Sequence, residues 1–105
     1  MKLRELLKVL TLMSKNSFTI DTIKMDYRDA YTFLERACNV NMPMYYSFNT
    51  IYETVQKLDD DTIEFKNGKL CVYYRHYENY LQDMIVYSID TTNELEIVVG
   101  YESNH

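Results

Sequence analysis

The sequence predicts an α+β fold, in which N-terminal helices pack on a C-terminal antiparallel sheet of about four strands. Apolar residues recur at helical spacing in the first half of the chain and alternate in the second half. In addition, the dipeptide Asn67-Gly68 is the strongest short-range signal for a β-hairpin. With 105 residues, 47% of them hydrophobic, the chain has room for one modest core. We therefore expect a single α+β domain over residues 1–105.

The first expected helix covers residues 2–13. Its apolar face is formed by residues at helical spacing, namely Leu3, Leu6, Leu7, Leu10 and Met13. Val9 and Leu12 widen this face, which indicates a core helix buried on more than one side. The basic residues of the same segment offer a second interpretation, a helix that binds anionic lipid. Stable attachment needs more charge or a longer apolar face, so we expect no membrane partner.

A second helix is expected from about Tyr27 to Cys38, after a β-branched segment over residues 18–25 that is compatible with a short irregular strand. Asp26 is a good N-cap, and Asp29 lies in the first turn, where the helix dipole favours a carboxylate. Residues 44–58 are ambiguous. Their first half is rich in strand formers, but apolar residues at helical spacing and a capping Ser47 favour a helix from about Phe48.

The strands are expected in the second half of the chain. A two-residue turn at Asn67-Gly68 sets Phe65 opposite Leu70 and Ile63 opposite Val72. Residues 76–82 are expected to be a short connection with about one helical turn. Residues 84–89 and 95–101 then alternate like a second hairpin, and the last strand is a candidate sheet edge.

The formal charge of −5 is unevenly distributed along the chain. Residues 1–15 carry a net charge of +3, whereas residues 16–105 carry −8. The segment from residue 76 to residue 105 contains no lysine or arginine but six carboxylates, which are Glu78, Asp83, Asp90, Glu94, Glu96 and Glu102. An acidic hairpin repels nucleic acid and membrane surfaces and attracts basic proteins. A solvated outer face explains the same pattern without a partner, and a metal site is a third interpretation.

Three of these carboxylates, Glu94, Glu96 and Glu102, share one strand parity. Alternate residues of a strand lie roughly 6.6 Å apart, which is close to the spacing of successive phosphates along a nucleic-acid strand. The three glutamates are therefore candidate partner-binding residues that imitate nucleic acid.

Tyrosine is unusually frequent, with eleven residues and no tryptophan. Tyr73, Tyr77 and Tyr80 are candidate partner-binding residues because exposed tyrosines favour protein interfaces. Their alternative role is to complete the packing of a small core. Stacking on nucleobases is disfavoured because single-strand binders add a basic groove, and the charge here has the opposite sign.

The sequence contains no catalytic motif, and His76 is the only histidine away from the chain end. The run Asp59-Asp60-Asp61 lacks the glycine of a calcium loop, and Cys38 and Cys71 lack the paired spacing of a zinc site. We therefore expect no enzyme activity, no cofactor and no metal. The first 13 residues are too charged for a signal-peptide core, so we expect a cytoplasmic protein with reduced thiols.

Two segments resemble parts of a group of known proteins. Residues 2–10, KLRELLKVL, look like the first helix of many short orphan proteins from phages and mobile elements of low-GC Gram-positive bacteria. Residues 80–90, YLQDMIVYSID, followed by LEIVV at residues 95–99, are similar to their closing hairpin. Inhibitors of host defence, anti-CRISPR proteins included, recur in this group, so the resemblance implies such a role.

These observations favour a non-enzymatic acidic binding protein, a phage-type inhibitor of a larger basic, nucleic-acid-handling host protein such as a CRISPR nuclease. In this hypothesis the glutamates compete for a nucleic-acid groove and the tyrosines supply apolar contact area. The alternative is a structural or regulatory domain that self-associates, as a homodimer, through an edge strand at residues 95–101.

Overall fold

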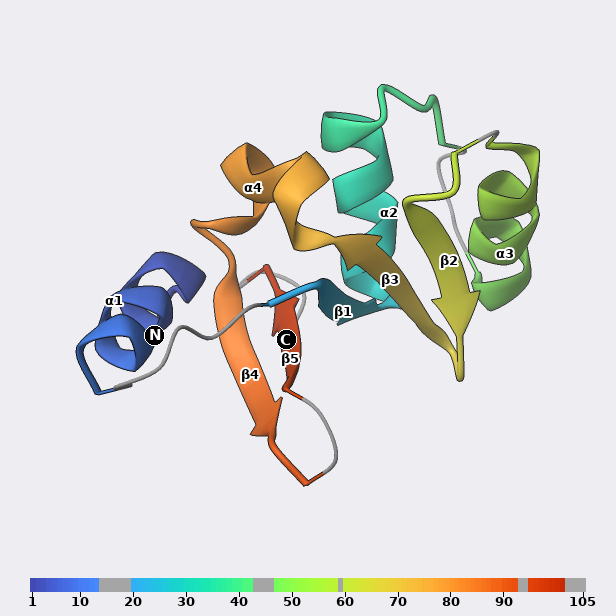
Figure 1. Cartoon of the computed structure of the whole chain (residues 1–105). Helices are drawn as coiled ribbons and strands as arrows, with labels where there is room; N and C mark the ends of the chain where they lie inside the picture. The colour runs from blue at the N-terminus through green and yellow to red at the C-terminus, as the bar shows by residue number, and fades with distance from the viewer. Residues whose placement is uncertain (14–19, 43–46, 59, 93–94, 102–105) are drawn as a thin grey trace.

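Five strands form one mixed sheet in the computed structural model, which describes residues 1–13, 20–42, 47–58, 60–92 and 95–101 (Figure 1). In chain order the strands are β1 (Thr22–Asp26), β2 (Ile63–Lys66), β3 (Lys69–Tyr73), β4 (Ile85–Asp90) and β5 (Glu96–Gly100). Their order in the sheet is β2-β3-β1-β5-β4. The predicted α+β class is confirmed. The expected antiparallel sheet of about four strands is corrected, because β1 lies at the centre and pairs in parallel with β5.

The helices of the described residues are α1 (Leu3–Met13), α2 (Tyr27–Ala37), α3 (Phe48–Lys57) and α4 (Tyr74–Leu81). The side chain of Asp26 accepts a hydrogen bond from the Asp29 amide and so caps α2 as expected. Ser47 caps α3 in the same way, through the amide of Thr50. The ambiguous segment is therefore helical from Phe48, while residues 44–46 lie outside the described part.

The β2–β3 hairpin has the predicted register. Phe65 pairs with Leu70 and Ile63 with Val72. Asn67 and Gly68 both have positive φ, at 51° and 77°, as a type I′ turn requires. A local turn signal thus fixed this part of the sheet.

The second hairpin, β4–β5, is also present, but its place in the sheet differs from the expectation. Strand β5 pairs on one side with β4 and on the other with β1, so residues 95–101 do not form a sheet edge. The edges are β2 and β4 instead. A register shift between Val86 and Ser88 introduces a bulge into β4.

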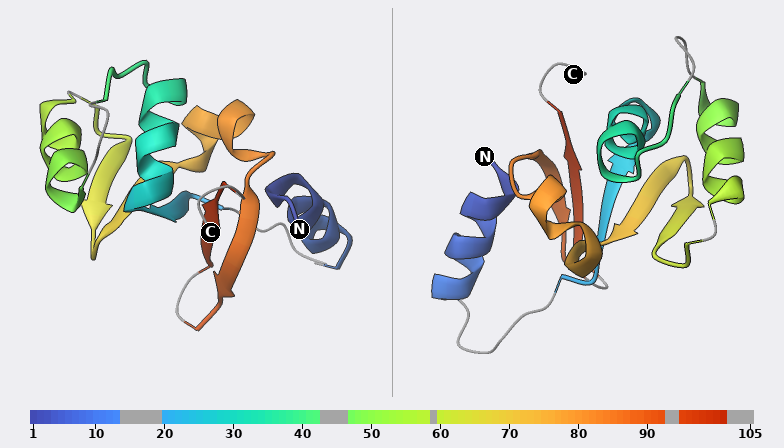
Figure 2. Two further views of the ribbon diagram at one scale, coloured as in Figure 1. Left: turned by 180° about the vertical axis from the view of Figure 1, so that it is seen from behind. Right: turned by 90° about the horizontal axis from the view of Figure 1, so that it is seen from above.

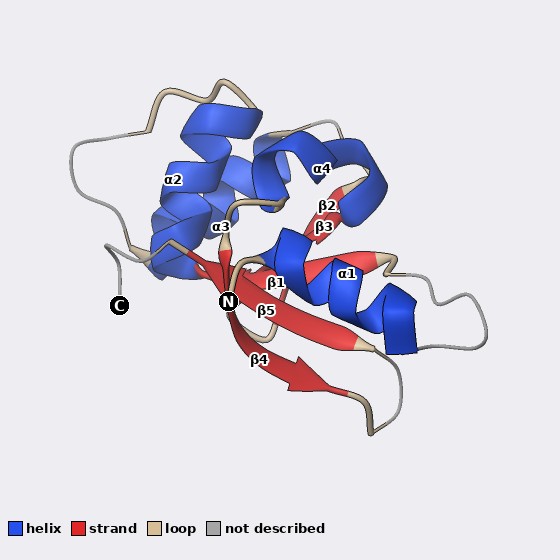
Figure 3. Cartoon of the chain, turned by 90° about the vertical axis from the view of Figure 1, so that its left-hand side faces the viewer, coloured by secondary structure: helices blue, strands red, loops and turns tan. Residues whose placement is uncertain are grey.

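The core lies between the sheet and the helices α2, α3 and α4, and Figure 3 shows α2 and α4 above the strands. Its largest fully buried side chains come from both layers, among them Phe33, Leu34, Ile51, Leu70 and Ile97. On β1 the buried Ile23 and Met25 alternate with the partly exposed Lys24. This alternation is typical of a sheet with one face toward the core and one toward water.

Helix α1 lies away from α2 and α3, beside β4 and α4 (Figure 2). Its start is bonded to that strand, since the amide of Leu3 donates to the carbonyl of Met84 at 2.9 Å and the amide of Val86 donates to Met1 at 2.9 Å. Only Leu3 and Leu6 are buried, whereas Leu12 is 86% exposed. The expectation of a helix buried on more than one side is therefore wrong, because Leu3 and Leu6 lie on one face and Val9 and Leu12 are exposed. No helix of the described residues is long and apolar enough to cross a bilayer.

A candidate binding groove between helices α1 and α4

A cavity of about 320 Å³ opens between α1 and the junction of β3 with α4. It is lined by residues from three distant segments of the chain, which are Leu7, Thr11, Ile20, Asp21, Tyr73, Tyr74, Arg75 and Glu78. We call this cavity the α1–α4 groove. Its volume is at the lower end of the range for ligand pockets, so it suits one or two side chains of a partner.

The chain turns sharply where the groove begins. Strand β3 ends at Tyr73, whose amide donates to the carbonyl of Thr62 at 3.1 Å, and α4 starts at the next residue. The amide of Tyr74 donates to the carbonyl of Asp21 at 2.9 Å, which ties the helix start to the segment before β1. Tyr73, the last residue of the strand, is exposed, whereas Tyr74, the first residue of the helix, is half-buried.

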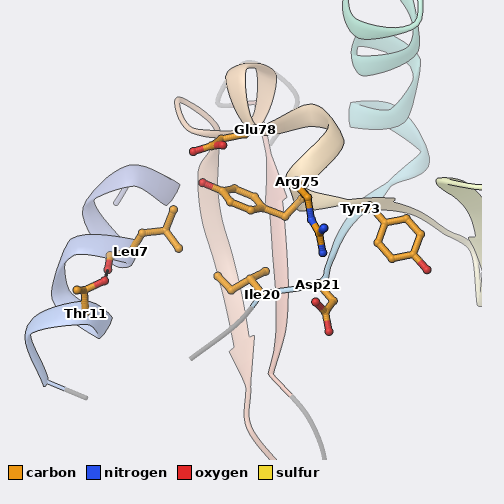
Figure 4. Close-up of a pocket in the computed structure, with 8 residues that line it drawn as sticks. Leu7, Thr11, Ile20, Asp21, Tyr73, Arg75 and Glu78 are labelled. Atoms are coloured by element: carbon orange, nitrogen blue, oxygen red, sulfur yellow. Dashed lines mark hydrogen bonds between the residues drawn. The ribbon is translucent and has the colours of Figure 1, made fainter. Parts of the chain in front are cut away.

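The lining combines apolar walls with charged ends. Figure 4 shows Leu7 of α1 reaching toward Ile20 across the groove, with Glu78 at one end and Asp21 at the other. The guanidinium of Arg75 extends toward the Asp21 end. Burial raises the pKa of the Tyr74 phenol above its ordinary value, which already lies well above physiological pH, so the phenol is neutral.

The groove continues along α1 as an open hollow of about 410 Å³, lined by Leu7, Lys8, Thr11 and Leu12. The two spaces share Leu7 and Thr11. Residues 7 and 12 lie about 7.5 Å apart along a helix axis, so the combined trough follows α1 for more than one turn.

Two of the three predicted tyrosines are available for contacts. Tyr73, just before α4, is 47% exposed, and Tyr80, in the last turn of α4, is 48% exposed. Tyr73 also lines the groove and packs edge-to-face on His76, with 5.9 Å between ring centroids. Both rings offer large and stiff contact area, and that of Tyr73 lies next to the cavity.

Tyr77 is not exposed, which corrects the sequence-based expectation for this residue. Only 8% of it is accessible, and its ring packs edge-to-face on Phe33 of α2 with 5.2 Å between centroids. Its hydroxyl donates to Oδ2 of Asp60 at 2.9 Å. Burial raises the pKa of the Tyr77 phenol, so the hydroxyl remains a donor. The spacing of Tyr74, Tyr77 and Leu81 on one helical face was the signal that could have indicated this burial.

Of the three glutamates predicted to form a line of charge, only Glu96 lies in the described part of the chain. Glu96 of β5 forms an ion pair with Lys24 of the neighbouring strand β1 at 3.1 Å. Glu94 and Glu102 lie outside the described residues. A second carboxylate of the acidic segment, Asp83, pairs with Arg4 of α1 at 2.7 Å. Cations from the first quarter of the chain thus offset part of the acidic hairpin.

The cysteines and the acidic loop have local structural roles. Cys38 and Cys71 are free thiols, and burial raises the pKa of both. Asp60 accepts hydrogen bonds from the hydroxyl and amide of Thr62 as well as from Tyr77. Among the described residues, which omit Asp59, no group of three or more His, Cys, Asp or Glu side chains is arranged to hold a metal ion.

Sequence reasoning also missed an exposed aromatic cluster near the β2 edge of the sheet. Phe65 of β2 packs edge-to-face on Phe48 at 5.0 Å and on Tyr52 at 6.4 Å between ring centroids. Phe48 and Tyr52 are 43% and 45% exposed. The shared helical face of Phe48 and Tyr52 indicated burial, but the short edge strand β2 covers only part of it.

No protein-family model, curated protein or solved structure matches the chain.

Proposed function

We propose that this chain is a non-enzymatic binding protein that docks on a larger basic protein through the α1–α4 groove and the exposed tyrosines beside it. The observation that carries the proposal is that Tyr73 both lines a cavity with apolar walls and stays half exposed at its rim. Interfaces concentrate binding energy where aromatic rings border a pocket that a partner side chain can fill. Tyr80 of α4 supplies a second exposed ring to the proposed interface.

The basic character of the partner is supported by charge. The chain carries −5 overall, and residues 76–105 contain no lysine or arginine. Because Glu96 is paired with Lys24, the imitation of phosphates by a line of glutamates loses one of its three members. The steering of a basic partner then depends on the summed field of the acidic body rather than on a single line of charge.

The inhibitory role and the class of target are supported by the resemblance to short phage proteins. In this proposal the partner is a nucleic-acid-handling host protein, a CRISPR nuclease being one case, and docking blocks its basic groove. The chain acts in the cytoplasm of the host cell and needs no cofactor.

A capture experiment followed by direct binding tests the proposal. The chain with a C-terminal tag is used to retain proteins from a Gram-positive host lysate, and each retained protein is purified and titrated with wild type. We expect the double variant Tyr73→Ala/Tyr80→Ala to weaken the binding of a basic partner at least tenfold, which corresponds to about 1.4 kcal/mol. Tyr52→Ala removes an equally exposed tyrosine from α3 and serves as the matched control.

The nuclease activity of the captured partner gives the second readout. Wild type should inhibit it, and the double variant should not. A partner that binds the double variant and wild type equally well would contradict the proposed surface, and binding without inhibition would contradict the proposed role.

A second candidate function is self-association through an edge strand. The edge strand is β4, and not β5 as the sequence had suggested. Two of its side chains, Tyr87 and Ile89, are 39% and 47% exposed. Unpaired edges recruit other strands. Light scattering coupled to size-exclusion chromatography separates the two candidates, because a strict monomer at high concentration removes the homodimer.

A further inference from the structure

Glu78 places a hydrogen-bonded carboxylate at the end of the α1–α4 groove. Its Oε1 accepts a hydrogen bond from Nε2 of Gln82 at 2.9 Å, one helical turn further on, which orients the carboxylate. Glu78 is exposed, and Figure 4 shows it at the end of the groove opposite Asp21, toward which Arg75 extends. One end of the groove therefore holds a cation together with a carboxylate, Arg75 and Asp21, whereas the other end presents the oriented carboxylate of Glu78.

The shape of the trough favours a helix as its occupant. Residues of α1 and α4 face each other across the cavity, and the hollow that continues it follows α1 for more than one turn, with the apolar Leu7 and Leu12 at its two ends. An amphipathic helix that lies in such a groove inserts side chains spaced three or four residues apart. An added strand would instead need a row of free backbone groups, whereas the walls here are side chains.

We infer that the α1–α4 groove binds an amphipathic helix of the partner, with apolar side chains between Leu7 and Ile20 and a lysine or arginine side chain on Glu78. This inference rests on the proposed function, because it names the segment by which the basic partner docks. Leu7 would contact the apolar face of any amphipathic helix in the groove. Glu78 would favour a helix that carries a lysine or arginine.

Two designed peptides serve as probes. Each has about 14 residues, the length at which an isolated helix becomes marginally stable, with leucine on one face. The polar face consists of lysine in the first peptide and of glutamate in the second. Backbone amide NMR of the full chain maps the contact, and fluorescence anisotropy gives the dissociation constants.

We expect the lysine peptide to bind at least tenfold more tightly than the glutamate peptide. The amide shifts should centre on Leu7, Thr11, Ile20 and Glu78, which line the groove. Glu78→Lys should remove or reverse the preference. Leu7→Ala should weaken both peptides, whereas Val9→Ala, an exposed position of α1 outside the lining, should weaken neither.

The control for net charge is Glu53→Lys, which makes the same charge change at an exposed position of α3. An equal loss in Glu53→Lys and Glu78→Lys would show attraction by overall charge and would overturn the inference. Shifts centred on Ser88 to Asp90 would show strand addition at β4, and shifts at Phe48 and Tyr52 would show binding at the aromatic cluster. Either result would also overturn it.

The partner from the capture experiment separates the two proposals. If Glu78→Lys leaves its binding unchanged while Tyr73→Ala/Tyr80→Ala abolishes it, the helix inference fails and the proposed function stands. If the peptides behave as expected but no basic protein depends on the two tyrosines, the groove specificity stands and the proposed function fails.

Discussion

Helices α1 and α2 both have 11 residues but differ in how much of each helix is buried. Seven residues of α1 are aliphatic or methionine, yet only Leu3 and Leu6 are buried. In the more polar α2, four residues are buried, including Phe33 and even the charged Asp29. Burial in this protein thus follows the position of a helix on the sheet rather than its apolar content.

The cause of the difference is the way each helix joins the sheet. Helix α2 follows the central strand β1 without a gap and is capped by Asp26, so its first turn is fixed over the middle of the sheet. The first residues of α1 are bonded to the turn between α4 and β4, and Met1 just before the helix is bonded to the edge strand β4. The second half of α1 extends beyond the core and forms one wall of the groove. An apolar surface that the fold leaves open is where a partner can gain contact area.

Phe33→Ala should produce the largest loss of stability, because α2 supplies more of the core than α1. Phe33 is fully buried and packs on Tyr77, so its loss leaves a cavity and removes an aromatic pair. We expect a loss of about 3–5 kcal/mol in the free energy of unfolding, measured by urea denaturation. A loss below about 1 kcal/mol would mean that α2 contributes no more to stability than α1, and would contradict the difference in burial between the two helices.

Gly100→Ala should have the next largest effect, because the end of β5 lies against the first turn of α2. A Cβ at this position would overlap the carboxylate of Asp29 and would lie 2.7 Å from Cε2 of Tyr87. Asp29 is fully buried, and its Oδ1 accepts a hydrogen bond from the Tyr101 amide at 2.9 Å, so it has little freedom to move. We expect a loss of about 1–3 kcal/mol by thermal denaturation. If Gly100→Ala leaves stability unchanged, the first turn of α2 can move away from the added methyl group at little cost.

The hydrogen bond between Asp60 and Tyr77 predicts a pH-dependent contribution on the α2 side of the molecule. Hydrogen bonds from Thr62 hold the pKa of the Asp60 carboxyl below its ordinary value. A group with a lowered pKa in the folded state stabilises the fold above its unfolded pKa of about 3.9, and this contribution disappears as the pH falls through the folded pKa.

Asp60→Asn should therefore lower stability at pH 7, and the difference from wild type should shrink below about pH 4. Denaturation at a series of pH values measures it. Asp61→Asn, at an exposed neighbouring position, is the control and should change little. A difference that persists unchanged at acidic pH would contradict the role of the ionised carboxylate.

Leu12→Ala in α1 should have the smallest effect. Its side chain is 86% exposed, so truncation removes little buried area, and we expect a change within about 0.5 kcal/mol. Urea denaturation beside Phe33→Ala checks this directly. A loss above about 1.5 kcal/mol would show that the second half of α1 is packed in solution, and the groove would then be closed.

Local signals predicted much of the fold. Asn67-Gly68 gave the register of β2–β3, and Asp26 and Ser47 marked the starts of two helices, because each of these features involves neighbours in sequence. The central position of β1 and its parallel pairing with β5 could not be predicted, since the two strands are about 70 residues apart and no local pattern specifies their contact.

The candidate site was predicted less well than the fold for the same reason. Tyr73 and Tyr80 were correctly expected to be exposed, but Tyr77 was assigned to a connection and not to a helix with a buried face. Lys24 and Arg4, which pair with Glu96 and Asp83, come from distant segments. The groove itself is built from three such segments, so only the folded chain reveals it.

The attachment of α1 has a consequence for hydrogen exchange. The backbone bonds Leu3 to Met84 and Val86 to Met1 hold this helix, whereas the central strands are paired on both sides. Units with few buried contacts open at lower free energy than the rest of a fold. The amides of α1 should exchange by local opening while β1, β3 and β5 remain protected, so the width of the groove can fluctuate without unfolding of the sheet.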